Sequence, residues 1–305
     1  MEVIKFGGTA LQTLNNRNNV LKIIQNKERP IFIICSAMGR MGFPYSTKTL
    51  MSLVDSNLLK GNELGVLLSC GEIISSIVLL STLRKEISNT KLITYDNYPI
   101  NKINDEFVLN SINYTNDDVF VIPGFIVKKD GVIDVLKMGE SDLSAILICK
   151  ILDNNKVSLY KDTDGIYPFY PKLTYNIKPH RYLSYDEAIL LNKLGYNIVN
   201  ENAIKYAKKY NIEINICYLN DDKVKTTISE KVSENEVFGF TFQKNNLIIA
   251  TRYPCKVKEF LEELFDLQHI IYKSISIDES FVNVTLMSTQ ILNAKRLLVN
   301  NLLNK

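Results

Sequence analysis

Two glycine-bearing stretches carry the residues best suited to hold a phosphate group. Lys5 to Thr9 (KFGGT) directly follows an apolar run, and its glycines let backbone N–H groups approach an anion while the lysine adds a positive charge. The stretch lacks the GKS or GKT ending of a Walker loop, so an ordinary tight turn explains it about equally well. Leu136 to Ala145 (LKMGESDLSA) places a glycine and a Ser-Asp pair between a strand-like and a helix-like run, but Glu140 adds a carboxylate to this candidate anion site.

Carboxylates stand at two further places where a ligand could bind. Lys161 to Tyr167 (KDTDGIY) follows the apolar run VSLY, and its two aspartates could bind Mg²⁺, a ribose or an adenine edge, although an Asp-Gly turn is the simpler interpretation. Glu72 lies inside a strongly apolar segment, where a carboxylate is unfavourable unless something pairs with it. Backbone amides and the ammonium group of a ligand are the two candidate partners for Glu72.

The composition is typical of a soluble globular protein. The 305 residues have a formal charge of +3 from 36 basic and 33 acidic side chains, which are scattered, and this disfavours nucleic acid as a partner. No signal peptide precedes the first glycines, and the most membrane-like window, Leu64–Leu83, contains Glu72 and several serines and therefore predicts a buried helix. The sequence thus predicts a cytoplasmic protein without a membrane partner.

Cysteine and histidine usage disfavours a metal site built by the protein alone. Five dispersed cysteines without a CxxC pair indicate reduced thiols, and the two histidines fit no zinc-ligand spacing with them. Magnesium that arrives with a nucleotide stays open, because it needs only a carboxylate or two besides the phosphates.

Short apolar runs alternate with segments of helical periodicity over the first 220 residues. Continuous runs of Ile, Val and Phe are typical of strands buried on both faces of a parallel sheet. The alternation predicts an α/β domain with an open, mostly parallel sheet and helices on both faces. Ser184 and Glu187 form a capping-box pattern at one helix start. Strands are expected at 2–6, 31–35, 91–94, 119–122, 157–160 and 213–218, and helices at 16–26, 47–60, 66–86, 142–153, 185–194 and 201–210.

The pattern changes after residue 220, which divides the chain into a large first domain (1–220), a connector (221–236) and a small C-terminal domain (237–305). The connector is polar and charged, with room for one short strand. The last part has a βαββα order typical of a small α+β module, too small to carry an active site of its own. Its strands are expected at 247–253, 270–277 and 281–287, and its helices at 256–265 and 291–303.

Seven motifs follow one another over about 210 residues: KFGGTA near the start, CSAMG (35–39), LLSCGE (67–72), GF (124–125), GESD (139–142), DTDGIY (162–167) and SYDEAILLNKLG (184–195). In their order and spacing they resemble the aspartokinases of the amino-acid kinase family. The stretch SAMGRMGFPYSTKTL (36–50) is especially similar to the aspartokinases of bacterial diaminopimelate and lysine synthesis. Residues 237–303 resemble one ACT regulatory module, where such enzymes usually carry two.

The resemblance implies the amino-acid kinase fold and one reaction. Aspartokinases transfer the γ-phosphoryl group of ATP, with Mg²⁺, to the side-chain carboxylate of L-aspartate. The product, 4-phospho-L-aspartate, starts lysine, threonine, methionine and diaminopimelate synthesis. Carried over position by position, Lys5 and Asp142 are the catalytic residues; Lys5, Gly7, Gly8, Asp162, Thr163, Asp164, Tyr167 and Lys172 bind the nucleotide; and Ser36, Thr47, Glu72, Phe125, Lys137 and Ser141 bind the substrate aspartate.

Several positions depart from the family pattern. Met138 and Glu140 replace an arginine and a glycine, Asn197 replaces a nucleotide-side lysine, and Asn202 replaces an arginine. Losing the charged partner of a buried carboxylate costs on the order of 2–5 kcal/mol, so two such losses could remove most activity unless neighbouring lysines take over. Two alternatives therefore stay open beside the aspartate kinase: a non-catalytic regulatory homologue, and a kinase of the same fold that acts on another small acid.

The ACT-like module has a departure of its own. Its turn RYPCKV (252–257) lacks the glycines that let an effector amino acid approach the backbone. The module is therefore expected to pair with a second chain and give a homo-oligomer, and feedback inhibition by lysine or threonine stays a second hypothesis.

Overall fold

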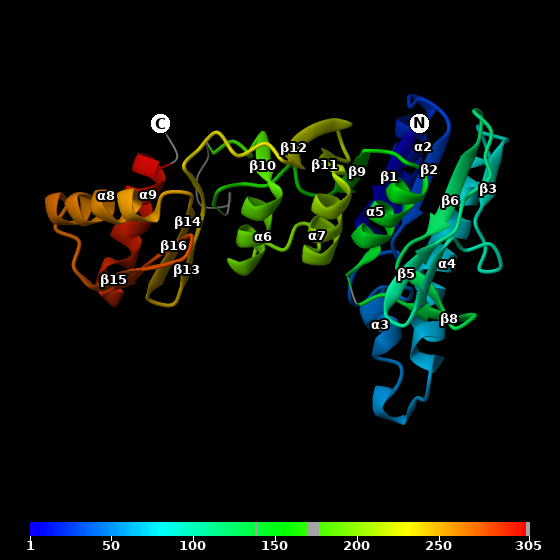
Figure 1. Ribbon diagram of the computed structural model, residues 1–305, viewed down its shortest axis with the longest axis horizontal. Helices are drawn as coiled ribbons and strands as arrows, with labels where there is room; N and C mark the ends of the chain where they lie inside the picture. The colour runs from blue at the N-terminus through cyan, green and yellow to red at the C-terminus, as the bar shows by residue number, and fades with distance from the viewer. Residues whose placement is uncertain (138, 170–176, 303–305) are drawn as a thin grey trace. The chain divides into compact units, whose positions relative to one another are not determined.

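The structure is a computed structural model that describes residues 1–137, 139–169 and 177–302, and its contacts divide the chain into two compact units (Figure 1). Unit 1 comprises Met1–Asp164 and Val199–Lys225, and unit 2 comprises Gly165–Ile198 and Thr226–Lys305. Residues 165–198, which the sequence placed in the first domain, therefore group by contacts with the C-terminal residues. The expected domain boundaries at 220 and 236 stay a prediction.

Unit 1 is built on a sheet of parallel strands that are largely buried on both faces. The six strands predicted for this part of the chain are all present, and each neighbouring pair among them is parallel. Since parallel strands end at the same edge, this sheet brings the loops after its central strands together. In spatial order the strands are β11 (Glu213–Tyr218), β9 (Lys156–Lys161), β1 (Glu2–Phe6), β2 (Ile31–Cys35), β6 (Val119–Pro123) and β3 (Thr90–Leu92).

Helices cover both faces of this sheet, as predicted. Side chains on one face of the sheet, such as those of Ile4 and Ile33, share a core with α2 and α4. Side chains on the other face, such as those of Val3 and Ile34, are also buried. Helix α5 contacts β1, β2 and β9, and α7 packs against α5. The helices of unit 1 are α1 (Gly8–Leu11), α2 (Leu14–Gln25), α3 (Thr47–Met51), α4 (Glu63–Leu83), α5 (Ser141–Ile151) and α7 (Glu201–Tyr210).

The helix predicted over 47–60 is wrong in length. The α-helix α3 ends at Met51, and only a 3₁₀ turn, η1 (Ser56–Leu58), follows. The hydroxyl of Ser52 donates to the Thr49 carbonyl, and the side chain of Asp55 accepts from the Asn57 N–H. Such local side-chain bonds compete with the helix ladder, which explains why the helix stops here.

Helix α4 is long and apolar enough, by length and composition, to cross a membrane. Half of its apolar window is buried inside the protein, and α4 contacts β2, β3 and β6. It also carries the buried Glu72. These features are those of a core helix, in agreement with the sequence prediction.

A second, small sheet in unit 1 was not predicted. Each of its strands has only four residues and mixes apolar with polar side chains, so none is a continuous apolar run. Positive φ angles at Asn104 and Asp105, and at Asp130 and Gly131, mark the two tight hairpin turns that join them. In spatial order the strands are β5 (Glu106–Leu109), β4 (Ile100–Ile103), β7 (Ile126–Lys129) and β8 (Val132–Val135).

Unit 2 contains a four-stranded antiparallel sheet covered by two helices. The βαββα elements are present as predicted, and a further strand, β13, precedes them. The sequence prediction missed β13 because Gly239 interrupts its apolar run. Phe265 of α8 and Leu298 of α9 share one core with Ile249 of β14. The elements are β13 (Val237–Gln243), β14 (Asn246–Thr251), α8 (Pro254–Leu267), β15 (Tyr272–Asp278), β16 (Phe281–Leu286), η3 (Ser288–Gln290) and α9 (Ile291–Leu302), and the strands lie in the order β13-β14-β16-β15.

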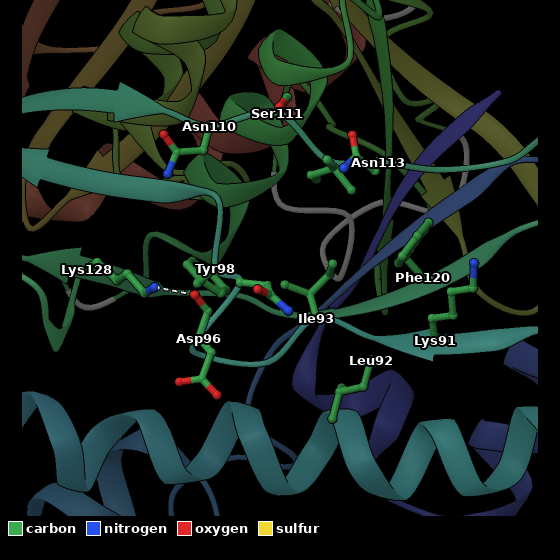
Figure 2. A pocket seen from close by; sticks show the side chains of 12 residues that line it. Lys91, Leu92, Ile93, Asp96, Tyr98, Asn110, Ser111, Asn113, Phe120 and Lys128 are labelled. Atoms are coloured by element: carbon green, nitrogen blue, oxygen red, sulfur yellow. Dashed lines mark hydrogen bonds between the residues drawn. The ribbon is translucent and has the colours of Figure 1, made fainter.

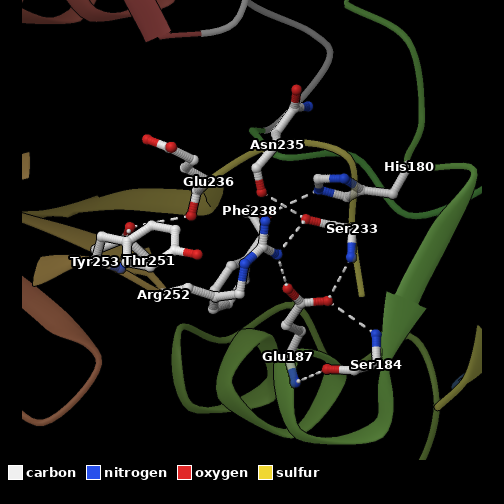
Figure 3. A network of polar contacts seen from close by, with 10 residues as sticks. All are labelled: His180, Ser184, Glu187, Ser233, Asn235, Glu236, Phe238, Thr251, Arg252 and Tyr253. Carbon is white, nitrogen blue, oxygen red and sulfur yellow. Dashed lines mark hydrogen bonds and ion pairs between the residues drawn. The ribbon is translucent and has the colours of Figure 1, made fainter. Parts of the chain in front are cut away.

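A buried polar network joins this sheet to helix α6 (Tyr185–Lys193) within unit 2 (Figure 3). The predicted capping box of Ser184 and Glu187 is present. The buried carboxylate of Glu187 also forms an ion pair with Arg252, at the end of β14, and accepts the Ser233 N–H at 2.8 Å. Strand β10 (Tyr182–Ser184) precedes α6 and pairs in parallel with β12 (Lys223–Ser229), the short strand anticipated in the connector.

Candidate active site

The carboxyl ends of four neighbouring strands bring the predicted phosphate-binding and substrate-binding residues of unit 1 together. Phe6 of β1 lies opposite Cys35 of β2 and Tyr160 of β9, and Cys35 lies opposite Pro123 of β6. Lys5, Ser36, Gly124 and Lys161 therefore emerge at one edge of the sheet. This is the edge at which ligands bind in open α/β sheets.

A buried cluster of two lysines and one aspartate lies at this edge. The Lys5 ammonium contacts one carboxylate oxygen of Asp142 at 2.7 Å, and the Lys161 ammonium contacts the other at 2.9 Å. Burial alone would raise the pKa of Asp142, but Lys161 and Lys5 outweigh burial and hold this pKa well below its usual range. Burial lowers the pKa of Lys161. Lys5 and Asp142 were predicted as catalytic residues; Lys161 was not predicted.

The glycine-rich turn after β1 packs tightly against the loop after β2. A side chain at Gly8 would lie 2.3 Å from the carbonyl oxygen of Ala37, so only glycine fits there, and the Gly39 N–H donates to the Gly8 carbonyl. The Gly7 N–H makes a long bond, 3.4 Å, to the carbonyl of Tyr160. Close packing thus accounts for Gly8, and donation to a phosphate by Gly7 and Gly8 stays a prediction.

Glu72, on helix α4, faces the same loop and is 2% exposed. One carboxylate oxygen accepts the Ala37 N–H at 3.2 Å, while the other is buried and has no partner among the described residues. Burial raises the pKa of Glu72 to about 8, and the Ala37 N–H and the Lys5 ammonium oppose that rise. A buried carboxylate with one free oxygen can accept a cationic group of a ligand.

Phe125 is held in a backbone conformation that bulky residues rarely adopt. Its φ is +66°, and the Ser144 hydroxyl accepts its N–H at 2.8 Å. Gly124 precedes it because a side chain there would lie 2.9 Å from the Cys35 carbonyl oxygen. Such strain persists where the surroundings over-determine it, commonly at functional sites. Ser36 follows β2, and Thr47 is the first residue of α3, capped by the Ser46 side chain.

The turn before α5 contains Glu140, one of the residues that depart from the family pattern. Glu140 is 4% exposed, and its carboxylate accepts the Lys137 N–H at 2.9 Å and the Asn202 amide at 2.6 Å. Ser141 and Asp142 follow as the first residues of α5. The Lys137 side chain is exposed, and Met138 lies outside the described residues. Glu140 therefore bonds within the protein and does not offer a free carboxylate.

The predicted nucleotide-side residues after β9 fall into three groups. Asp162 forms an exposed ion pair with Arg40, and Thr163 and Asp164 are exposed in the same unit. Tyr167 belongs to unit 2, as does Asn197. Lys172 lies outside the described residues.

A cavity of about 530 Å³ in unit 1 is a separate feature (Figure 2). Among the predicted site residues that the structure describes, none lines it. Its wall includes Lys91, Asn113 and Lys128, and the Lys128 ammonium donates to the Asp96 carbonyl. Tyr98 also lines it, and the Tyr98 hydroxyl donates to the Pro123 carbonyl at the end of β6. Tyr98 therefore has one side in the cavity and its hydroxyl at the candidate site.

The donor set fits a metal that arrives with a ligand. Among residues 1–137, 139–169 and 177–302, no group of three His, Cys, Asp or Glu side chains could hold an ion. Both oxygens of Asp142 are occupied by lysines. Mg²⁺ is commonly held by one or two carboxylates together with substrate phosphates.

Aspartokinases are among the known proteins similar to this chain. At 26% identity, Aspartokinase 1 of Bacillus subtilis (strain 168) aligns over 93% of this chain and 75% of its own length. The aspartokinase of Geobacillus stearothermophilus, also 26% identical, aligns over 79% of this chain and 62% of its own length. The chain thus spans three quarters or less of these relatives.

Solved structures show the same fold. E. coli aspartokinase III in complex with aspartate and ADP superposes with a TM-score of 0.68 at 16% identity, covering 98% of this chain and 83% of that chain. The aspartate kinase from Synechocystis gives 0.67 at 20% identity, covering 97% and 54%. The Amino acid kinase family model matches residues 1–218. Because this match covers well over half of its length, the chain belongs to the amino acid kinase family.

Proposed function

We propose that the chain is an aspartate kinase, which uses ATP to phosphorylate the side-chain carboxylate of L-aspartate. The observation that carries this proposal is the presence, at one sheet edge, of a buried lysine–aspartate cluster and of Glu72 with one unpartnered oxygen among the described residues. A cationic cluster suits a transferring phosphoryl group, and a buried carboxylate suits an ammonium group. Together they fit an amino acid as phosphoryl acceptor, and the curated aspartokinase relatives support aspartate.

In the proposed reaction, a side-chain carboxylate oxygen of aspartate attacks the γ-phosphorus of ATP. A new O–P bond forms, the bond from the γ-phosphorus to the oxygen that bridges to the β-phosphate breaks, and that oxygen keeps the electron pair and leaves on ADP. Charge spreads over the oxygens of the transferring group, so fixed positive charge is the main contribution required of the protein. Lys5 supplies this charge, and Asp142 fixes the position of its ammonium group.

The amino acid lies between the loops after β2 and β6. The free oxygen of Glu72 accepts the substrate ammonium, while Ser36, Thr47, Phe125 and Ser141 frame the rest of the molecule. Lys137, exposed and adjacent to position 138, reaches the substrate α-carboxylate in place of the missing arginine. Because its pKa is raised, Glu72 holds a proton when no substrate is bound. In this arrangement the substrate ammonium takes the place of that proton.

The nucleotide enters as its magnesium complex. Gly7 and Gly8 face its phosphates, and Asp162, Thr163 and Asp164 contact its remaining part. The nucleotide contacts expected of Tyr167 and Lys172 stay predictions. Magnesium neutralises phosphate charge when bound.

The departure at Glu140 is compatible with activity. Its carboxylate accepts hydrogen bonds from the Lys137 N–H and the Asn202 amide, which stabilise it inside the protein. A carboxylate held in this way does not compete with the substrate for the Lys5 and Lys161 ammonium groups, which bond Asp142.

We further propose that unit 2 provides an ACT-like surface for homo-oligomer formation. Strand β15 is an edge strand, and Leu267, Ile271 and Leu292 of the same unit are 60–73% exposed. An exposed edge strand flanked by apolar side chains is suited to pair with another chain. Activity in the cytoplasm, at the start of lysine synthesis, completes the proposal.

An acceptor panel tests the proposed function. Full-length protein with MgATP should release ADP when L-aspartate is added, and much more slowly with L-glutamate, D-aspartate or UMP. UMP is included because the UMP kinase from Bacillus anthracis superposes with a TM-score of 0.53 at 16% identity. ADP release that does not depend on aspartate, or that requires UMP, contradicts the proposal.

A further inference from the structure

Lys161 is the last residue of β9 and has no role assigned by the sequence motifs. Strand β9 pairs in parallel with β1, so that Leu159 and Tyr160 of β9 lie opposite Lys5 and Phe6 of β1. Its side chain is 15% exposed, and its ammonium group bonds both oxygens of Asp142, at 2.9 and 3.2 Å. Two neighbouring strands thus deliver one lysine each to the same carboxylate.

The charges of this cluster do not balance. Lys5 and Lys161 together carry two positive charges, and Asp142 carries one negative charge. Glu72, the next acidic group near Lys5, has a pKa raised to about 8 and is largely uncharged at neutral pH without a ligand. Asp162 also acts on Lys161, but its carboxylate is exposed and paired with Arg40. The cluster of Lys5, Lys161 and Asp142 therefore carries a net positive charge, which is unfavourable in a largely buried place unless an anion binds there.

A single lysine would be enough to neutralise Asp142. Burying a second ammonium adds a desolvation penalty and a repulsion from Lys5, and both oppose the charged form of Lys161. A purely structural role does not explain that arrangement. An anion that contacts both ammonium groups explains it, because the ion then supplies the missing negative charge.

We propose that Lys161 is a second catalytic lysine, which contacts the γ-phosphoryl group of ATP together with Lys5 and stabilises its charge during transfer. This inference rests on the proposed function and assigns a residue to it. The aspartokinase resemblance expects a nucleotide-side lysine at position 197, where this chain has the uncharged Asn197. Lys161 supplies a positive charge from a different element, the end of β9.

The experiment compares binding of ATP with binding of ADP, and then turnover. Calorimetry on the full chain measures both dissociation constants, and the coupled ADP assay with aspartate measures kcat and KM. The variants are Lys161→Gln and Lys161→Met, which remove the charge, and Lys161→Arg, which keeps it. Lys156→Gln, at the exposed first position of the same strand, is the matched control.

Wild-type protein is expected to bind ATP at least tenfold more tightly than ADP. Lys161→Gln should lose most of that preference and lower kcat about 100-fold or more with a small change in the KM for aspartate. Lys161→Arg should stay within about tenfold of wild type in kcat, and Lys156→Gln should match wild type. If Lys161→Gln fails to fold, Lys161→Met, which keeps an unbranched side chain of similar length, serves for the same comparison.

Two other results separate the inference from the proposed function. Wild-type kcat and ATP preference retained within threefold in Lys161→Gln or Lys161→Met would overturn the role of Lys161 and leave the aspartate kinase intact. An ATP preference that depends on Lys161, without turnover of aspartate, would support the γ-phosphoryl contact and overturn the proposed acceptor.

Discussion

The carboxylate of Glu140 accepts a hydrogen bond from the side-chain amide of Asn202 at 2.6 Å. Both residues depart from the aspartokinase pattern, which has a glycine and an arginine at these positions. The contact joins residues 62 positions apart and buries the added carboxylate with a neutral donor. Two departures that look damaging one at a time therefore compensate each other in the folded protein.

Asn202→Ala should destabilise the protein by about 1–3 kcal/mol, because it leaves a buried oxygen of Glu140 without this donor. Glu140→Gly combined with Asn202→Ala should lower the free energy of unfolding by less than the sum of the two single changes. The difference should be about 0.5–3 kcal/mol. Urea denaturation of the four proteins measures this coupling. Glu201→Ala, which removes an exposed i,i+4 pair with Lys205 on the same helix, is the control and should cost about 0.5 kcal/mol or less. Additive effects would show that the two residues do not compensate each other.

Glu72→Gln should weaken aspartate binding about 100-fold and remove a pH dependence. In wild-type protein the affinity for aspartate should rise on the order of tenfold between pH 6.5 and 8, because the carboxyl with its pKa raised to about 8 must lose a proton to bind an ammonium group. Calorimetry across this pH range measures both effects. Affinity that is flat with pH in the wild type would contradict the assignment of Glu72.

Glu72→Gln should also raise the free energy of unfolding at alkaline pH. The folded pKa of Glu72 lies above the unfolded value of 4.5, so its contribution favours folding fully below pH 4.5 and is lost as the pH rises through about 8. Glu72→Gln removes this loss, on the order of 2–5 kcal/mol at pH 8.5, and the difference from wild type should shrink towards pH 5. Thermal unfolding at pH 5, 7 and 8.5 measures it; an equal difference at all three values would contradict the raised pKa.

Arg252→Ala should destabilise unit 2 by about 3–5 kcal/mol, because it leaves the buried Glu187 carboxylate without its cationic partner (Figure 3). The paired change Glu187→Gln with Arg252→Leu should recover much of this loss. Lys256→Ala, which breaks an exposed pair with Glu236, is the control and should change stability by about 1 kcal/mol or less. Denaturation followed by Tyr fluorescence reports the order of these effects; equal losses for Arg252→Ala and Lys256→Ala would show that burial of the pair is unimportant.

Ile271→Asp with Leu292→Asp should convert the proposed homo-oligomer to a monomer, since each places a charge on an exposed apolar side chain of unit 2. Light scattering after size-exclusion chromatography gives the mass. Leu58→Asp, on a side chain that is 75% exposed in unit 1, is the matched control and should keep the wild-type mass. A monomeric wild-type protein, or an oligomer unaffected by the double change, would contradict the proposed surface.

Much of the central fold could be predicted because its physical causes are local. Strands such as β2 and β6 are continuous apolar runs, and Ser184 with Glu187 forms a capping box within four residues. The strands β4, β5, β7 and β8 could not be found in this way, since each has only four residues and none is a continuous apolar run. The Asn104-Asp105 and Asp130-Gly131 pairs, which have positive φ angles, were the available indication of their turns.

The candidate site was predictable as far as its residues lie in glycine-rich motifs. Lys5 and Asp142 were found by their motifs and are 2.7 Å apart in the structure. Lys161 was missed because its importance depends on the register of β9 against β1, which no short motif encodes. The partner of Glu140 was missed for a similar reason, since Asn202 reaches it only through tertiary packing.

Trapping the acyl phosphate tests the central claim most directly. Protein incubated with MgATP, L-aspartate and hydroxylamine should form a coloured hydroxamate that depends on aspartate, and Lys5→Ala should lower its rate at least about 100-fold because the cation on the transferring group is gone. Lys60→Ala, which replaces an exposed lysine of unit 1, should form hydroxamate at the wild-type rate. Absence of an aspartate-dependent hydroxamate in protein that still binds ATP would contradict the account, and would leave a kinase of another acid or a regulatory homologue as the interpretation.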